Sequence, residues 1–229
     1  MRVKLYPIDY YTEPVSGGRT YTSTRRQEQA RQTRRAILDA AARLFVDPGY
    51  AATRLTTVAA EAGVAVQTLY AVFGSKRQLL SELVDVTIAG DDAPVALPDR
   101  AFVAEIRALP GARERLARFA RHLAETHQRQ AQVMLALAGA ATADADAAAV
   151  WRKNLEDRQR GMTMFAADLA GTGELRDDLE PERVADVLWL AQDVRNYDRL
   201  VRERGWTSEQ FQQWYVDTVA GAILTTSPA

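Results

Sequence analysis

Apolar and polar residues in the first third of the chain follow the spacing of short α-helices. The first apolar stripe, within residues 32–46, consists of Ile37, Leu38, Ala41, Leu44 and Phe45. Pro48 and Gly49 follow this stripe and are expected to end the helix, because neither residue favours continued helical backbone. A later stripe predicts a helix over residues 76–89, which ends in the turn-forming run 90–94.

Two shorter helical patterns lie between these stripes, within Leu55–Lys76. The apolar positions of the first pattern are Val58, Ala59 and Ala62, and those of the second are Val66, Leu69, Tyr70 and Phe73. A tight turn at Gly63–Ala65 joins them, and Gly63 can adopt the left-handed backbone that ends a helix. Two small helices that cross over such a turn form a helix-turn-helix, whose second helix can enter a DNA major groove.

The remaining two thirds of the chain also have helical spacing, with no sustained strand-like alternation and no internal repeat. The expected helices cover residues 100–109, 112–128, 130–140, 145–170, 181–204 and 208–225. Gly205 can end the last helix but one, and Thr207 with Gln210 forms a capping box at the start of the last. The pattern therefore predicts an all-α protein.

Three regions follow from this pattern. Residues 1–30 contain Pro and Gly without a sustained period, so we expect a flexible N-terminal arm. The arginines near its end can reach a minor groove or flanking phosphates, or this segment is simply a solvated tail. Residues 31–76 are the expected helix-turn-helix DNA-binding domain of three helices, and residues 77–229 are the expected larger helical domain.

Composition excludes several classes of function. The chain has no cysteine, which rules out disulfides and thiolate metal sites. No stretch approaches the ~20 apolar residues of a membrane span, and Pro7, Asp9 and Glu13 interrupt any signal-peptide core. His122 and His127 are the only histidines, and their spacing of five does not suit a metal pair on one helix face. We therefore expect a cytoplasmic protein with no metal, no cofactor and no catalytic residue.

Charge is unevenly distributed along the chain. Residues 1–80 carry 12 Lys or Arg and 6 Asp or Glu, whereas residues 81–229 carry 17 and 24. A basic first part suits a polyanion and an acidic remainder is repelled by one, although a difference of this size also arises by chance. Together with the helix-turn-helix, the asymmetry favours DNA as the partner.

The residues of this region resemble a known family. The resemblance begins with Arg34-Arg35-Ala36-Ile37-Leu38-Asp39-Ala40-Ala41 and continues through Leu44-Phe45, Gly49-Tyr50, Thr53, Ala59, Gly63-Val64, Thr68-Leu69-Tyr70, Phe73 and Lys76. In this order and spacing the chain resembles the tetracycline-repressor-like (TetR) family of bacterial transcription regulators. The resemblance is specific over residues 34–76, and the rest of the chain matches the family mainly in length and helical content, with one further local likeness at residues 200–206.

The residue types of the expected recognition helix fit DNA contacts. The candidate DNA-binding residues are Arg54, Thr56, Ala65, Val66, Gln67, Thr68, Tyr70 and Lys76. The amide of Gln67 can make a bidentate contact to adenine, and Lys76 at the start of the fourth helix can clamp a phosphate. The family resemblance places the Tyr70 hydroxyl on the DNA backbone, although this tyrosine can instead brace the helix. Ala65 stands where the family commonly has a Ser cap, and Val72 where a His is common.

For the larger domain, the resemblance implies a small-molecule effector and a homodimer formed through the last two helices. Candidate residues lining an effector pocket are Phe102, Phe119, His122, Met134, Leu137, Trp151, Leu155, Met162, Phe165, Trp189, Asp193 and Asn196. Each of the large apolar residues can equally be plain core, since any helical bundle needs such side chains. Few cations are expected to be buried here, which favours an apolar or weakly polar ligand.

The sequence thus predicts a homodimeric, ligand-responsive repressor of a pseudo-palindromic operator in double-stranded DNA. The choice of repressor over activator rests on family habit. Two other classes stay open: a helical adaptor whose helix-turn-helix packs on protein, and a helical enzyme. The enzyme is disfavoured because the chain has no nucleophile elbow, phosphate loop or zinc-protease motif.

Overall fold

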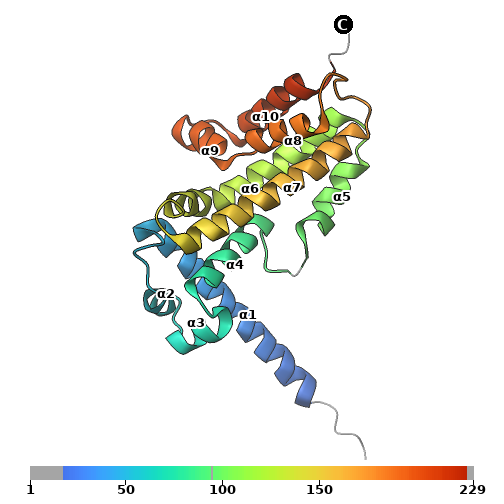
Figure 1. Ribbon diagram of the computed structural model, residues 1–229. Coiled ribbons are helices and arrows are strands. Elements are labelled where there is room, and N and C mark those ends of the chain that lie inside the picture. The colour runs from blue at the N-terminus through green and yellow to red at the C-terminus, as the bar shows by residue number, and fades with distance from the viewer. Residues whose placement is uncertain (1–17, 94, 226–229) are drawn as a thin grey trace, which may run out of the picture.

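The computed structural model describes residues 18–93 and 95–225, and within them the protein is all-α, as predicted (Figure 1). Its elements are α1 (Gly18–Leu44), η1 (Phe45–Gly49), α2 (Leu55–Glu61), α3 (Val66–Phe73), α4 (Lys76–Ala89), η2 (Leu97–Asp99), α5 (Ala101–Ala108), α6 (Ala112–Ala140), α7 (Ala145–Ala170), α8 (Pro181–Ala191), α9 (Val194–Tyr197), η3 (Asp198–Glu203) and α10 (Ser208–Ile223). The only extended pairing in these residues is an isolated antiparallel bridge between Leu175 and Leu224.

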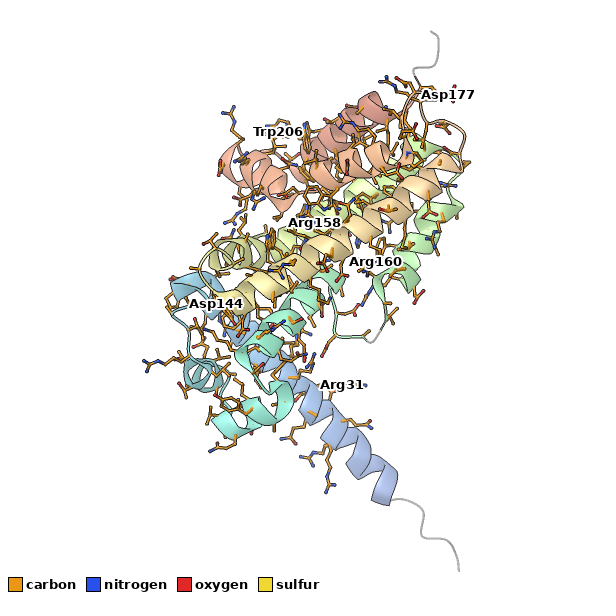
Figure 2. All side chains as sticks on the ribbon, in the orientation of Figure 1. Arg31, Asp144, Arg158, Arg160, Asp177 and Trp206 are labelled. Atoms are coloured by element: carbon orange, nitrogen blue, oxygen red, sulfur yellow. The ribbon has the colours of Figure 1, made fainter. Side chains whose placement is uncertain are left out.

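The first helix starts much earlier than its apolar stripe indicated. α1 begins at Gly18 rather than near residue 32, so part of the expected flexible arm is helical, and residues 1–17 of that arm lie outside the described residues. Between Gly18 and Pro48 the chain has no Gly or Pro and is rich in Arg, Gln and Ala, which favour helix without needing an apolar face. Arg31 lies where α1 extends beyond the other helices (Figure 2).

Helices α1 to α4 form the smaller, helix-turn-helix domain. Its large fully buried side chains include Ile37, Phe45, Val58, Leu69, Leu79 and Leu80, and they belong to a hydrophobic core that continues into the rest of the protein. Gly63 has φ +67° and joins α2 to α3, which are bent by 109° at this turn. This geometry confirms the predicted helix-turn-helix. No single described helix is long and apolar enough to cross a membrane; only α2 and α3, counted together as a bent pair, reach that length and apolarity.

The larger domain is built on two long helices, α6 and α7, which run side by side (Figure 1). α10 packs on α6 and α8 packs on α7, while α5 packs on the first half of α6, where Phe102 stacks on His122. α6 is continuous, so the expected break near residue 129 is wrong. The apolar pattern weakened there because Thr126, His127 and Gln130 are polar, yet all three are buried on the inner side of the helix.

The expected helix over residues 181–204 is also wrong, because the chain is broken between α8 and α9. Asp193 has extended backbone angles, and its carboxylate accepts a hydrogen bond from the N–H of Arg195 at 2.9 Å. The amide of Asn196 donates to the carbonyl of Leu190 at 3.0 Å and to that of Ala191 at 3.3 Å. Two polar side chains therefore cap the facing helix ends, and the chain can turn without leaving those backbone groups unsatisfied.

The last helix begins with the capping box expected from the sequence. The Thr207 hydroxyl accepts from the N–H of Gln210 at 3.2 Å, and the Gln210 side chain accepts from the N–H of Thr207 at 2.9 Å. Phe211, Tyr215, Val219 and Ile223 of α10 are fully buried within the subunit. A partner subunit can therefore meet only the opposite side of this helix.

The bare start of α3 gives a prediction about stability. Ala65 precedes α3 with cap-like angles (φ −67°, ψ 144°) but offers no side-chain hydrogen bond. Ala65→Ser is expected to raise the free energy of unfolding by about 1 kcal/mol, because a hydroxyl here can accept from the N–H groups in the first turn of α3, such as that of Gln67. Urea unfolding measures the change against Ala71→Ser, an exposed site inside α3 where no cap can form. Equal free energies for the two variants would contradict this account of the helix start.

Candidate DNA-contacting surface and effector cavity

One side of α3 is buried and the other is free. Leu69 and Phe73 are buried in the core of the small domain, whereas Gln67 is exposed and Tyr70 exposes 50% of its surface. Val66 and Thr68 are half-buried, and Val66 packs against the core. The first turn of α3 thus presents the Gln67 amide outward, which is the geometry that a recognition helix needs.

The other candidate DNA-binding residues lie at helix starts around α3. Arg54 directly precedes α2, Thr56 lies in its first turn, and Ala65 directly precedes α3; all three are exposed. The structure therefore leaves each of them open to a partner.

Lys76 is not the free ammonium that the sequence indicated. Its Nζ donates to the carbonyl of Tyr50 and lies 4.1 Å from the centroid of the Tyr50 ring, a cation–π contact. Partial burial lowers the pKa of Lys76. The neighbouring Arg77 is exposed, with its Nη1 3.7 Å from Asp146 of α7. Lys76 therefore ties the start of α4 to η1 and α2, and Arg77 is a second cation at this helix start that the sequence analysis missed.

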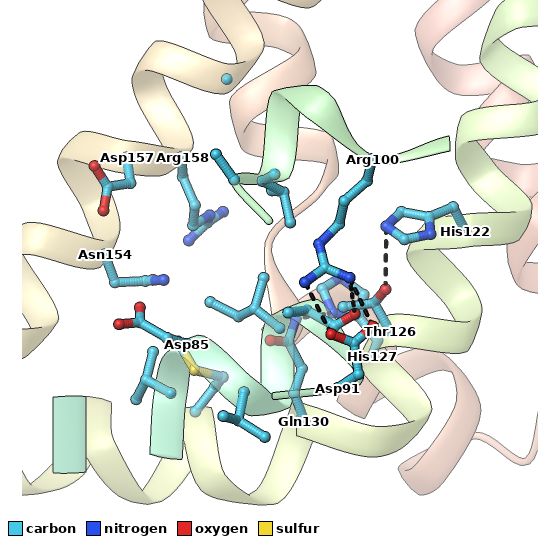
Figure 3. Close-up of a pocket in the computed structure, with 18 of the residues that line it drawn as sticks. Asp85, Asp91, Arg100, His122, Thr126, His127, Gln130, Asn154, Asp157 and Arg158 are labelled. Atoms are coloured by element: carbon cyan, nitrogen blue, oxygen red, sulfur yellow. Dashed lines mark hydrogen bonds and ion pairs between the residues drawn. The ribbon is translucent and has the colours of Figure 1, made fainter. Parts of the chain in front are cut away.

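A cavity of about 620 Å³ lies between α4, α6, α7 and the segment 91–100 (Figure 3). This volume is typical of a pocket for a small organic ligand. Its apolar wall includes Val84, Ile88, Phe119, Leu123, Met134 and Val150. The cavity lies directly behind the helix that follows the recognition helix.

The structure brings together half of the residues suggested as pocket lining. Those that line the cavity are Phe102, Phe119, His122, Met134, Trp151 and Met162. Those that do not are Leu137, Leu155, Phe165, Trp189, Asp193 and Asn196. Phe165 packs behind Phe119 with ring centroids 4.8 Å apart, and the Arg158 guanidinium lies 5.3 Å from the Trp189 ring centroid. Asn196 is occupied with the end of α8.

Charged groups are more numerous at the cavity than the sequence indicated. Arg100 forms two hydrogen bonds to Asp91, at 2.8 and 3.0 Å, and these lower the pKa of that carboxyl to about 2. Arg34 of α1 pairs with Glu82 of α4 and with Asp92. The expectation of a cation-poor pocket is therefore wrong. The sequence did not reveal these cations, because a long charged side chain that is paired at a cavity has the same sequence pattern as one exposed to solvent.

A buried hydrogen-bonded chain forms one end of the cavity. His127 Nε2 lies 3.0 Å from the carbonyl oxygen of Gln192, so this nitrogen carries the proton and donates. Nδ1 is then the acceptor for Gln130 Nε2, at 3.1 Å. Burial lowers the pKa of His127 to about 4, so the ring is neutral near pH 7. The orientation of the Gln130 amide is fixed by this chain, and its oxygen is left over.

In the part of the chain that the structure describes, no group of three or more His, Asp or Glu side chains is arranged to hold a metal ion.

The small domain matches a known family. Residues 37–83 fit the family model described as bacterial regulatory proteins, tetR family. This match covers the end of α1, all of α2 and α3 and the first half of α4, so the helix-turn-helix of the chain is similar to that of the TetR regulators. The protein is thus a DNA-binding transcription regulator. No curated protein matches the chain.

Solved structures share the fold of this chain over most of its length. A putative transcriptional regulator from Saccharomonospora viridis in complex with choline is 24% identical with a TM-score of 0.61, covering 84% of this chain and 98% of its own. A putative TetR-family transcriptional regulator from Rhodococcus sp. is 19% identical with a TM-score of 0.65, covering 85% and 99%. The ketosteroid transcriptional regulator KstR2 of Mycobacterium tuberculosis is 19% identical with a TM-score of 0.54, covering 84% and 95%. At these identities the likeness concerns the fold.

The buried His127 makes the stability of this regulator depend on pH. The pKa of His127 is lower in the folded protein than the value of about 6.5 in an unfolded chain. The unfolded state therefore binds more protons between pH 6.5 and about 4, and stability falls as the pH falls through this window. Between pH 7.5 and pH 5 the loss from this residue is expected to be roughly 2 kcal/mol.

Urea unfolding at the two pH values measures this loss, with His127→Gln as the comparison. The variant is expected to lose less stability between pH 7.5 and pH 5 than the unaltered protein, because it has no proton to take up at this position. An identical loss in both proteins would show that His127 is not the titrating group.

Proposed function

We propose that this regulator is a homodimeric repressor that a small molecule, bound in the cavity, releases from a pseudo-palindromic operator. One observation carries the proposal: α4 both follows the recognition helix directly and forms a wall of the cavity. The regulator acts by binding rather than by catalysis, since its chemistry is that of contacts to DNA and to a ligand.

The exposed side of α3 supports major-groove binding. Gln67 has a free amide at the start of the helix, with Tyr70 one turn further on. Arg54 and Thr56 at the start of α2, together with the N-terminus of α4, lie where phosphates flank the groove in this kind of complex. Ala65, Val66 and Thr68 contribute methyl and hydroxyl groups beside Gln67, and Lys76 acts by holding the start of α4 as well as by charge.

The outward side of α8 and α10 supports dimerisation. Leu190 on α8 exposes 62% of its surface, with Val187 one turn before it. On α10, Thr218 and Gly221 are exposed, which allows another helix to approach closely. A large exposed apolar residue on one helix of a pair and small exposed residues on the other are typical of a helix–helix interface between subunits. These helices lie at the end of the molecule away from α3, so a dimer leaves both recognition helices free (Figure 1).

Coupling between the two sites follows from how α4 is held. Its Leu79, Leu80, Leu83 and Val84 are buried, and it contacts α1 and α3 as well as α6 and α7. A ligand that fills the cavity and displaces α4 also displaces α3, which alters the separation of the two recognition helices in a dimer. The size of the effect equals the difference in ligand affinity between the two arrangements.

The neighbouring structure with choline supports a ligand role for the large domain, because a protein of the same fold holds a small organic molecule. The candidate effector residues that line the cavity here are Phe102, Phe119, His122, Met134 and Trp151. Phe165, Trp189 and Asn196 are better explained as support for the cavity wall and for the end of α8.

Selection of bound duplexes from a random pool, at fixed moderate salt, tests this function. We expect one enriched two-fold symmetric site whose half-sites lie about 34–36 Å apart along the helix axis. Weak, salt-sensitive binding without an enriched sequence would instead favour a protein-binding adaptor. Repeating the selection with an effector present distinguishes such an adaptor from a regulator that needs its ligand in order to bind DNA.

The division of roles among the DNA contacts gives a prediction. Gln67→Ala is expected to lose about 1–3 kcal/mol of discrimination at particular bases, because the amide reads a base edge. Arg54→Ala is expected to weaken binding to all sequences and to flatten the salt dependence, because a phosphate contact carries no sequence information. Fluorescence anisotropy across salt concentrations measures both. If the two variants lost affinity equally on every sequence, this assignment would be wrong.

The proposed subunit interface gives a further testable prediction. Leu190→Glu is expected to shift the protein to monomers, because a carboxylate would be desolvated at the centre of the contact. Val46→Glu is the control, since Val46 is an exposed apolar residue on the small domain. Sedimentation velocity measures both variants, and a dimer unaffected by Leu190→Glu places the interface elsewhere.

A further inference from the structure

The polar groups of the cavity are not all satisfied, and those left over are two amide oxygens that accept hydrogen bonds and two nitrogens that donate them. Four of the buried side-chain atoms that lack a hydrogen-bond partner belong to cavity residues: Arg100 Nε, Gln130 Oε1, Asn154 Oδ1 and Gln192 Nε2. Gln130 and Asn154 are more than nine-tenths buried, at 8% and 6% exposed. Buried polar atoms without partners are rare in proteins and mark a place for a bound group.

The free atoms of Gln130 and Asn154 offer acceptors to a ligand. The hydrogen bond from Gln130 Nε2 to His127 fixes the amide, so Oε1 is an acceptor that no rotation can replace without breaking the His127 chain. Asn154 has no hydrogen bond within the described residues, so its amide can present its oxygen to the cavity by turning over.

Asp85 supplies a third acceptor, on α4. It lines the cavity beside Asn154 (Figure 3), and no described residue forms a hydrogen bond or ion pair with it. Its surface is open to the cavity, yet enough protein surrounds the carboxyl to raise its pKa by desolvation, with Asp157 and Glu82 adding to the rise and Lys153 opposing it. Asp85 is therefore a carboxylate without a hydrogen-bonded partner beside Asn154, in the cavity that Gln130 also lines.

The cations at the cavity already have acidic partners. Arg100 holds Asp91, Arg34 holds Glu82 and Asp92, and Lys153 lies 2.7 Å from Asp157. Arg158 lies 3.6 Å from Asp193 and donates to the carbonyl of Trp189. An anionic ligand would have to compete with a carboxylate for each of these cations. A cationic ligand, in contrast, finds in Asp85 a carboxylate that has no hydrogen bond or ion pair with a described residue.

We infer that the effector is an amphipathic organic amine, whose protonated nitrogen donates hydrogen bonds to Asp85, Asn154 and Gln130 and whose apolar body lies along Val84, Phe119 and Met134. This inference rests on the proposed function, since it assigns a chemical class to the ligand of the same cavity. Charge and hydrogen bonding act together at the nitrogen, and a charge-assisted hydrogen bond is about twice as strong as a neutral one. Asp85 belongs to α4, which directly follows the recognition helix. Binding of the amine is therefore expected to shift α4, and with it the recognition helix.

Four compounds that share one apolar body separate the possible chemistries. They are 4-phenylbutylamine, its N,N,N-trimethyl quaternary analogue, 4-phenyl-1-butanol and 4-phenylbutyrate. Isothermal titration calorimetry on the full chain is expected to rank the amine first, about tenfold tighter than the alcohol. The quaternary compound keeps the charge without an N–H donor, so it is expected to bind more weakly than the amine.

Two variants locate the charge that recognises the amine. Asp85→Asn is expected to weaken binding of the amine about tenfold and to leave the affinity for the alcohol unchanged, because the substitution removes the charge and keeps the shape of the side chain. Asp186→Asn on α8 removes an exposed carboxylate away from the cavity and is expected to change neither. Both substituted side chains are exposed, and circular dichroism confirms that the variants fold.

The outcomes separate this inference from the proposed function. If the carboxylate or the alcohol binds tightest and weakens operator binding, the effector role stands and the amine class is wrong. If the amine and the quaternary compound bind equally, the claim that the amine donates N–H hydrogen bonds is wrong. If Asp85→Asn leaves the affinity for the amine unchanged, Asp85 does not belong to the site. If none of the four compounds binds, both the amine class and the ligand role of the cavity fall.

Discussion

The structure depends on one helix that packs against both domains. α4 buries Leu79, Leu80, Leu83 and Val84, and it contacts α1 and α3 of the small domain and α6 and α7 of the large domain. Its start is held to η1 by Lys76, and its middle is held to α1 by the pair of Arg34 with Glu82. Because packed interiors resist deformation, a displacement of α4 also displaces the helices that pack against it in both domains. The recognition helix and the cavity are therefore coupled through α4.

The small domain was largely readable from the sequence. Its helices are short and amphipathic, so the apolar spacing placed α4 at its observed bounds and located α2 and α3 on either side of the turn that Gly63 marked. The same method missed the first half of α1, because a helix that projects from the body needs no apolar stripe. It also missed the break after α8, which depends on two side-chain caps rather than on hydrophobicity.

The cavity was harder to predict, for a physical reason. Aromatic residues at helical spacing are equally suited to a core and to a pocket, and half of the suggested residues do not line the cavity. The polar residues that define the cavity, such as Asp85, Asn154 and Arg158, come from three turns of two helices and look like solvated positions in the sequence. Gln130 and His127 lay on the inner face of α6, and a pair of polar residues on a buried stripe was the one signal available.

The central claim is that filling the cavity moves the recognition helices. Because the chain has no cysteine, Ala71→Cys on the exposed side of α3 takes a single spin label in each subunit. Gly161 lines the cavity with open space around its Cβ position, so Gly161→Phe fills the cavity without a ligand, and Gly139→Phe is a matched control outside it. Pulsed electron spin resonance measures the distance between the two labels in the dimer. The account predicts a shifted distance for Gly161→Phe alone, and the same distance in all three proteins would contradict it.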